Sequence, residues 1–416
     1  MTVILDPDSP DLRRFIQPGD RILCAEGPGE PQTLIRALVE QRASLGGVEV
    51  FVGLGLGSTL RPDSVDGLRM RSYGALGTTR KLADAGLLDI VPVGLGDIPA
   101  MLERGDLGFD VVLTSVAPAG DDGSYPLGLM ALHVPAAIRH ARTVIVEVNA
   151  QMPRTFGVSV PAARLAAMVH SDLPPLLSPT STPDPVVEAI AAHVASVVPD
   201  GATLQLGVGA IPDAVCRHLG QHRDLGIHSG MLSDGLIDLM RRGVVTNRLK
   251  AEARGVSVVG AVLGSEDAYR FVHQNPEVRL EGVETTHGMA HLEPALVSIN
   301  SALEIDVQGQ VNAESVGGRY IGAIGGQPQF TRAGARSLKG AGIIALPSTV
   351  IGAKGRRISR IRGAPVERVT TASNDVDIIV TEFGVARLSG RSFAERRQAI
   401  LAIAHPDFRE NLAKAV

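Results

Sequence analysis

Short apolar runs alternate along the chain with segments in which apolar residues recur every three or four positions. The runs are typical of strands buried on both faces, and the spaced segments are typical of amphipathic helices. Strands that alternate with helices predict an α/β fold with a mostly parallel sheet in each half and helices outside it. The expected strands are residues 21–25, 48–52, 88–93, 111–115, 143–148, 203–206, 226–229, 256–262, 296–300, 342–346 and 377–381.

One strand, loop and helix pattern occurs twice. The segment PGDRILCAEGPGEPQTLIRAL begins at Pro18, and PDGATLQLGVGAIPDAVCRHL begins at Pro199. When these prolines are superposed, Pro31 falls on Pro212 without a gap, and an arginine and a leucine also coincide. In each copy a proline is expected to begin the helix, where its missing N–H is harmless. We interpret the two halves as copies of one α/β unit.

A proline-rich stretch separates the halves. The sequence SDLPPLLSPTSTPDP carries five prolines from Pro174 to Pro185, which predicts a stiff, non-helical linker. A chain of 416 residues is long enough for two domains of ordinary size. We therefore expect an N-terminal domain of residues 1–175, a linker of residues 176–185 and a C-terminal domain of residues 186–416.

Composition and charge narrow the classes of partner. Hydrophobic residues make up 44% of the chain and charged residues 20%, and a net charge of -4 argues against a nucleic-acid surface. The two cysteines, Cys24 and Cys216, suggest neither a disulfide framework nor a zinc site. The N-terminal residues MTVILDPDSPDLRR do not resemble a signal peptide, and no apolar run reaches the roughly 18 residues of a membrane span. We expect a cytoplasmic protein that acts on small molecules, without a metal, nucleic-acid or membrane partner; whether it forms a homo-oligomer stays open.

A glycine loop between a strand and a helix is the first candidate site. Gly207, Val208 and Gly209, in LGVGAIP, present backbone N–H groups at an expected helix N-terminus, which suits an anion or a thioester oxygen. The next strand ends within DLGIHSGMLSDG, residues 224–235. Ligands bind at the carboxyl ends of strands in open parallel sheets, so we expect the site at these two loops.

Eight blocks of sequence stand out along nearly the whole chain: DDGSYPLG (121–128), VIVEVNAQMPRT (144–155), LQLGVGAIPDAV (204–215), DLGIHSGMLSDGLIDL (224–239), INSALEIDVQGQVNAES (299–315), GAIGGQPQF (322–330), SNDVDIIVTEFGVARLSG (373–390) and IAHPDFRE (403–410). In this order they resemble the acetyl-CoA hydrolase/transferase family, which includes 4-hydroxybutyrate and butyrate CoA-transferases. The resemblance implies two related α/β domains of the CoA-transferase (NagB/RpiA-like) type with the active site in the cleft between them. It also implies that coenzyme A takes part, as the acyl-CoA substrate.

The resemblance also shows what this chain lacks. In that family a glutamate attacks the acyl-CoA and passes through a mixed anhydride to a glutamyl-CoA thioester, which splits one transfer into two easier steps. The family pattern HTEM or HSEM reads His228, Ser229, Gly230, Met231 here, so a glycine stands at the nucleophile position. A glycine cannot form the anhydride. Other departures from the family pattern are Phe156 and Val158 in MPRTFGVS, Pro328 and Gln329 in GGQPQF, and the segment VETTHG at residues 283–288.

Several residues are candidates for a remodelled site. His228 lies two residues before Gly230, and side chains two apart on a strand share a face, so it is a candidate base; a structural histidine in the sheet is the alternative. His287, with Glu284 nearby, could supply a new base for an amine or hydroxyl acceptor, and the alternative is a solvated loop. A triad of Ser229, His228 and Asp234 is disfavoured because neighbours on a strand point to opposite faces.

The remaining candidates follow from the resemblance. It implies close-approach and oxyanion positions at the family's glycine loops, which are Gly207 and Gly209 with Val208, and Gly325 and Gly326 with Gln327. Turns that simply require glycine are the alternative. Lys354 and Arg356, in IGAKGRR, could pair with CoA phosphates, or belong to a solvated basic loop. Glu304 and Asp306 are expected to serve structure.

Three functions remain open at this point. The preferred hypothesis is an acyl-CoA-dependent transferase that passes the acyl group directly from the thioester to an amine or hydroxyl, with no glutamyl-CoA intermediate. The second is a CoA-transferase or acyl-CoA hydrolase that uses another carboxylate or water. The third is a non-catalytic homologue that binds acyl-CoA.

Overall fold

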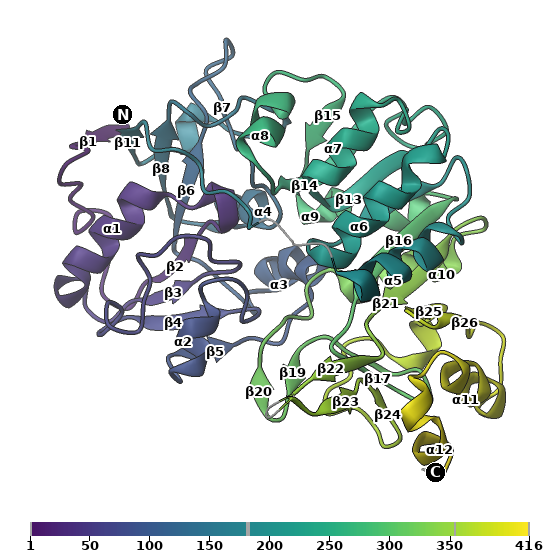
Figure 1. Cartoon of the computed structure of the whole chain (residues 1–416). Coiled ribbons are helices and arrows are strands. Elements are labelled where there is room, and N and C mark those ends of the chain that lie inside the picture. Colours follow the sequence, from purple (N-terminus) through teal and green to yellow (C-terminus); the bar gives the residue numbers. More distant parts are fainter. Residues whose placement is uncertain (1, 180–183, 353–354, 415–416) are drawn as a thin grey trace. The chain divides into compact units, whose positions relative to one another are not determined.

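The computed structural model describes residues 2–179, 184–352 and 355–414, and it divides into two compact units (Figure 1). The first unit comprises Met1–Pro179, Val258–Thr286 and Tyr320–Gly325, and the second comprises the rest of the chain. The predicted linker overlaps the first boundary, with its residues 180–183 outside the described part. Two later segments belong to the first unit, so the expected C-terminal domain of residues 186–416 is not one uninterrupted unit.

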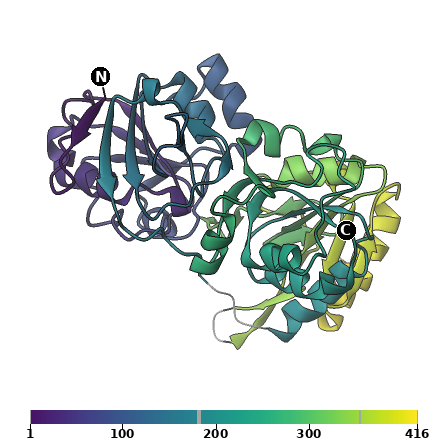
Figure 2. The ribbon, with the colours of Figure 1, turned by 90° about the horizontal axis from the view of Figure 1, so that it is seen from above.

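The first unit is built on an eight-stranded parallel sheet in the order β1-β11-β8-β6-β2-β3-β4-β5 (Figure 2). Its centre is fixed by Ile22, which pairs with Val50 on one side and Val111 on the other. All three are buried in one core cluster with Leu34 and Leu38 of the first helix, so that helix packs its apolar face on the sheet. The strands are β1 (Val3–Leu5), β2 (Arg21–Cys24), β3 (Glu49–Phe51), β4 (Arg69–Ser72), β5 (Leu88–Ile90), β6 (Val111–Val116), β8 (Thr143–Asn149) and β11 (Ala167–Ser171).

Helices and short strands complete this unit. The helices are α1 (Gln32–Gln41), α2 (Arg80–Asp84), α3 (Ile98–Arg104), α4 (Val134–His140), α8 (Glu266–Val272) and α9 (Val283–Thr286). The remaining strands are β7 (Tyr125–Pro126), β9 (Phe156–Gly157), β10 (Ser159–Val160), β14 (Ser257–Val262) and β15 (Val278–Leu280).

The second unit contains a sheet with strands in the order β26-β25-β21-β16-β12-β13. The pairs are parallel except for β26, which runs antiparallel to β25. The strands are β12 (Thr203–Leu206), β13 (Gly226–Leu232), β16 (Leu296–Ser301), β21 (Ala341–Ala345), β25 (Ile378–Thr381) and β26 (Gly384–Arg387). The helices are α5 (Pro185–Ala195), α6 (Ala210–His218), α7 (Asp234–Arg241), α10 (Gln327–Arg336), α11 (Phe393–Ala402) and α12 (Pro406–Lys414).

Short strands lie outside this main sheet. They are β17 (Glu304–Asp306), β18 (Val311–Asn312), β19 (Ser315–Val316), β20 (Arg319–Tyr320), β22 (Thr349–Ile351), β23 (Arg357–Ser359) and β24 (Ile361–Arg362). Within the three described stretches of the chain, no helix is both long enough and apolar enough to cross a membrane.

The predicted α/β class with mostly parallel sheets is confirmed, and the two units share a local topology. In the first, β2 lies between the parallel strands β3 and β6, and in the second, β12 lies between the parallel strands β13 and β16. This agreement supports the interpretation of the halves as copies of one unit. Pro31 directly precedes α1, as expected, but α6 begins at Ala210, so Pro212 is its third residue. A proline fits there because the first N–H groups of a helix have no partner within it.

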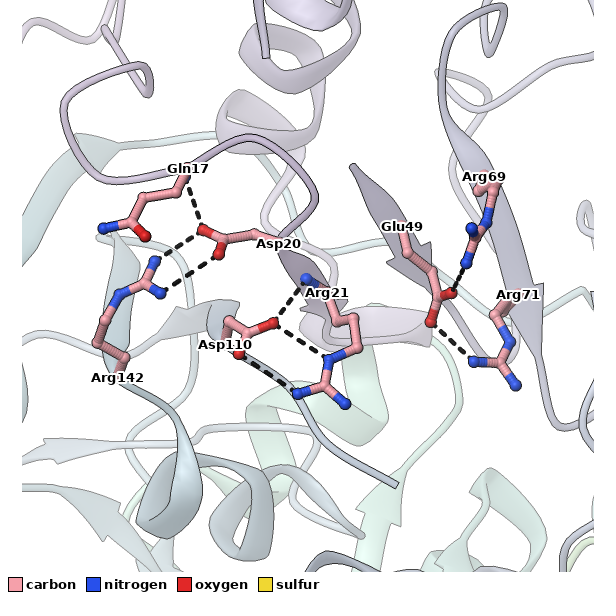
Figure 3. A network of polar contacts seen from close by, with 8 residues as sticks. All are labelled: Gln17, Asp20, Arg21, Glu49, Arg69, Arg71, Asp110 and Arg142. Atoms are coloured by element: carbon pink, nitrogen blue, oxygen red, sulfur yellow. Dashed lines mark hydrogen bonds and ion pairs between the residues drawn. The ribbon is translucent and has the colours of Figure 1, made fainter. Parts of the chain in front are cut away.

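Ion pairs hold the strands of the first unit together near their amino ends (Figure 3). Arg142 donates to both oxygens of Asp20, and Arg21 donates its backbone N–H and its side chain to Asp110. Glu49 of β3 accepts from Arg69 (2.6 Å) and Arg71 (2.9 Å) of β4. Because the arginines are partly exposed, each pair is worth only about 0–1 kcal/mol. The network nevertheless ties the start of one strand to the next.

Candidate functional site

The carboxyl ends of β12, β13 and β16 meet at one edge of the second unit's sheet. Thr203 pairs with both Gly226 and Leu296, so the three strands run in register toward that edge. The hydroxyl of Ser229 donates to the carbonyl of Leu206 (3.1 Å) and accepts from its N–H (3.3 Å). Position 230 therefore follows directly after the point where β12 and β13 are tied together.

The glycine loop begins where β12 ends. Gly207 donates its N–H to the carbonyl of Ile299 (3.2 Å), and Gly209, with a φ of 123°, immediately precedes α6. Apart from the adjacent residues of the loop, no residue in the described part of the chain comes within 4 Å of the place that a Cβ would take at either glycine. Val208 between them is 45% exposed. The loop is thus open, with the N-terminal end of a nine-residue helix behind it, as an oxyanion position requires. The role itself stays a prediction.

The imidazole of His287 lies against the backbone of Gly230 and of Gly326. A Cβ at position 230 would stand 3.2 Å from Cε1 of His287 and 3.5 Å from Nε2. A Cβ at position 326 would stand 2.4 Å from Nε2 and 2.6 Å from Cδ2. The ring therefore fills the place of a side chain at position 326, and it would have to give by a few tenths of an ångström for one at position 230. His287 is only 5% exposed, so the solvated-loop alternative for this residue is wrong.

Phe330 of α10 holds the histidine from another side. The two ring centroids are 4.5 Å apart, with an angle of 46° between the planes. Phe330 is itself fixed in a buried cluster with Ala290, Leu296 and Ala333. Such close packing restricts the imidazole to one place at this edge of the sheet. Sequence reasoning had named His287 and both glycines separately, without their mutual contact.

The other residue of the altered segment, Glu284, has a different environment. It lies in α9 of the first unit, is half-exposed, and forms an ion pair with Arg139. For Glu284 the solvated alternative fits the structure.

The segment from Gly325 to Gln327 leads into α10. Gly325 has a φ of 59°, and its carbonyl accepts from the N–H of Leu95 within the first unit (2.9 Å). Gln327 is buried; its side chain donates to the carbonyl of Ser301 (2.7 Å) and accepts from the hydroxyl of Thr371 (3.0 Å). The Gln327 amide is therefore engaged in holding the second unit together, and its predicted part in acyl-CoA binding stays a prediction.

The triad of Ser229, His228 and Asp234, which the sequence disfavours, has no support in the contacts of its serine either. Ser229 is buried, and its hydroxyl is engaged with Leu206 on the neighbouring strand. His228 is also buried within β13, and Asp234 begins α7. The use of His228 as a base stays a prediction.

Two basic residues, Lys354 and Arg356, were the candidates for contacts with the CoA phosphates. Lys354 lies outside the described residues. Arg356 is exposed in the β22–β23 hairpin, where its carbonyl accepts from the N–H of Gly352 (2.8 Å). Glu304 is paired with Arg362, and Asp306 accepts bonds from the turn at Gln308 and Gln310, as expected of structural residues.

Sequence reasoning missed two acids at the carboxyl end of β2 in the first unit, of which Glu26 is buried and Glu30 is partly buried. Glu26 accepts from the hydroxyl of Tyr73 (3.0 and 2.9 Å) and from the N–H of Leu54 (3.0 Å). Glu30 accepts from the N–H groups of Leu56 (2.6 Å) and Gly57 (3.1 and 3.2 Å). Backbone N–H groups of the alternating sequence GLGLG, residues 53–57, thus donate hydrogen bonds to both carboxyl groups.

Burial changes the acidity of both groups. It raises the pKa of Glu26 from 4.5 to about 7, although the bonds from Tyr73 and Leu54 act in the opposite direction. Burial likewise raises the pKa of Glu30 to about 7, against the bonds from Leu56 and Gly57. The acids line a cavity of about 20 Å³, room for one water molecule. The repeat superposes Glu26 on Gly207 (26 + 181 = 207), so the second copy gave no hint of an acid here.

The two cysteines and the possible metal ligands were also considered as site residues. Cys24 and Cys216 are buried thiols whose pKa is raised, chiefly by that burial. Among the residues that the structure describes, His, Cys, Asp and Glu side chains form no group of three or more that could hold a metal ion.

Comparison with known proteins gives matches along nearly the whole chain. Residues 9–199 match the acetyl-CoA hydrolase/transferase N-terminal domain, and residues 264–416 match the C-terminal domain of the same name. A 4-hydroxybutyrate coenzyme A transferase of Clostridium kluyveri is 37% identical over 403 residues, which cover 95% of this chain and 94% of the relative. A succinyl-CoA:cyclohexane-1-carboxylate CoA transferase of Geobacter metallireducens is 36% identical over 407 residues, covering 96% and 92%.

Solved structures agree with these matches. RipA from Yersinia pestis superposes with a TM-score of 0.92 at 33% identity, covering 99% of this chain and 96% of RipA. A 4-hydroxybutyrate CoA-transferase from Porphyromonas gingivalis superposes with a TM-score of 0.80 at 29% identity, with the same coverage.

Proposed function

The chain belongs to the acetyl-CoA hydrolase/transferase family, and from the glycine at position 230 we propose that it is an acyl-CoA-dependent transferase that works by direct acyl transfer. In this reaction the acyl group passes from the thioester to an amine or hydroxyl acceptor, without a covalent enzyme intermediate. The relatives named above are CoA transferases. We therefore propose that this chain also uses coenzyme A, in the form of an acyl-CoA substrate.

One observation carries the proposal. Position 230 offers only backbone, and a Cβ there would stand 3.2 Å from Cε1 of His287, closer than ordinary van der Waals contact. The chain therefore has no carboxylate at this position to form a glutamyl anhydride. Without that intermediate, an acceptor can attack the acyl carbon directly.

The glycine loop supports the same chemistry. Gly207, Val208 and Gly209 leave open space in front of the N-terminal end of α6, at the edge where β13 also ends. Backbone donors aimed at a thioester oxygen would stabilise the negative charge that develops when the acceptor attacks the carbonyl carbon. The carbon–sulfur bond then breaks, and CoA leaves as the thiol.

The test uses acetyl-CoA and butyryl-CoA as donors and hydroxylamine as a small amine acceptor. Release of free CoA that depends on the acceptor, with no mass added to the protein, supports the proposal. Binding of acyl-CoA without any turnover supports a non-catalytic homologue instead. Exchange of CoA between acyl-CoA and labelled acetate, with a CoA adduct on the protein, supports a CoA-transferase that uses another carboxylate.

A specific observation keeps that second candidate in view. Glu26, which is buried, and Glu30, which is partly buried, are acids whose pKa is raised to about 7, so each is partly ionised near neutral pH. Peptide mapping of the protein after incubation with acyl-CoA separates the candidates. An adduct on the peptide that contains Glu26 or Glu30 would favour CoA transfer or hydrolysis through that acid, and would contradict direct transfer.

A further inference from the structure

We propose that His287 is the general base of the transfer and that Gly230 and Gly326 form the notch that admits its ring. The inference rests on the proposed function for the reaction, but the notch itself rests on geometry alone. It joins three positions that are far apart in the sequence.

The two glycines bracket the same part of the imidazole. Nε2 is the nearest atom to a Cβ at position 326 (2.4 Å) and the second nearest to one at position 230 (3.5 Å). Contacts shorter than about 3.0 Å between a Cβ and another heavy atom do not occur in proteins, so an alanine at position 326 would displace the ring. At position 230 the nearest atom is Cε1 at 3.2 Å, which a small movement could relieve.

The ring lies beside the position that the resemblance assigns to the nucleophile. Its Cε1 is 3.2 Å and its Nε2 3.5 Å from the place of a Cβ at position 230. The same strand edge carries the open loop at Gly207 and Gly209. A group at this place would lie beside a thioester carbonyl held by that loop.

An imidazole can act as the base that direct acyl transfer requires. An amine or hydroxyl acceptor must give up a proton as it attacks the carbonyl carbon, and Nε2 of a neutral histidine can take it. The new bond forms between the acceptor atom and the acyl carbon, the carbon–sulfur bond breaks, and the imidazolium returns the proton to the departing CoA sulfur. Atoms and charge balance without a further reactant.

The rival interpretation is that His287 only fills the aromatic cluster with Phe330. Acceptors of different acidity distinguish the two. Hydroxylamine must lose a proton during attack, whereas the thiolate of 2-mercaptoethanol, used at a pH above its pKa, needs no base and is about as basic as the CoA thiolate that it displaces. With butyryl-CoA as donor and the uncatalysed rate subtracted, H287N should lower kcat for hydroxylamine about 100-fold while KM for butyryl-CoA and transfer to this thiolate change little. H140N, at an exposed histidine of α4, is the matched control and should match wild type.

A second measurement tests the notch without relying on turnover. Thermal unfolding of G230A and G326A should show a lower Tm, with the larger loss for G326A because its contact is the shorter. In an H287A background the loss for G230A should disappear and that for G326A should shrink to what its 3.2 Å contact with Phe330 leaves. G207A is the matched control, because among the residues that the structure describes none but its chain neighbours comes within 4 Å of its Cβ position.

The outcomes separate the claims. If wild type releases CoA with neither acceptor, the proposed function is overturned together with the base role. If H287N loses both acceptors equally or neither, only the base role is overturned. If the glycine and histidine substitutions are additive in Tm, the notch is overturned whatever the activity.

Discussion

The carboxyl group of Glu26 occupies the place in which Gly53 has no side chain. A Cβ at position 53 would stand 1.2 Å from Oε2 of Glu26 and 2.7 Å from Cε1 of Tyr73. A glycine thus makes room for a polar side chain from another strand end, as Gly230 does for His287.

We expect G53A to destabilise the protein. The new methyl group collides with a fully buried carboxyl group and with the ring that bonds to it, and overpacking of this kind typically costs about 1–3 kcal/mol. Urea unfolding measures the change. If G53A and the G207A control have the same free energy of unfolding, the carboxyl group of Glu26 can move aside freely.

Stability should fall as the pH rises from about 4.5 to about 7. In this window the unfolded chain releases the proton of Glu26 while the folded chain holds it, because burial raises the folded pKa from 4.5 to about 7. The loss is complete above the folded pKa and is on the order of 3 kcal/mol at most. E26Q removes this proton linkage, so its free energy of unfolding should vary less between pH 5 and pH 8. Urea unfolding at several pH values checks this, and parallel curves for E26Q and wild type would contradict it.

Restoring the family's glutamate alone should fail. In G230E the new side chain meets the His287 ring, so we expect no CoA transfer to acetate and no enzyme thioester. In G230E/H287A the space is free, and a CoA adduct on the peptide that contains position 230 should become detectable by mass spectrometry. Equal activity of the single and double variants would mean that His287 does not obstruct this position.

S229A should lose stability and keep activity. Its hydroxyl bonds to both backbone groups of Leu206, and the loss of such a bond typically costs about 1 kcal/mol. If acyl transfer to hydroxylamine persists in S229A, the serine is a tie between β12 and β13. Complete loss of turnover in a folded S229A would instead make it a nucleophile.

The strands were predictable because each is a continuous apolar run, the pattern of a parallel sheet covered on both faces. The duplication was visible in the same way, since Pro31 and Pro212 mark equivalent loops. The inclusion of Val258–Thr286 in the first unit was not predictable. Hydrophobic periodicity describes local structure and does not indicate which core a segment joins.

The site was predictable only in part. Gly230, Gly326 and His287 were each named from the family pattern, but their contact depends on how the chain returns to one sheet edge. The acids Glu26 and Glu30 gave no signal of burial, because charged residues beside a glycine loop usually face solvent. The GLGLG run was the available clue, and its meaning emerged only once Gly53 and Gly57 were seen against the carboxyl groups.

The pairs of arginines and carboxylates in the first unit lie near the amino ends of its strands (Figure 3). These ion pairs do not involve the loops at the carboxyl ends of the same strands. The loop that carries Glu26 and Glu30, after the carboxyl end of β2, can therefore vary without disturbing these pairs. Raised salt, which weakens exposed ion pairs, should loosen the amino ends of these strands first.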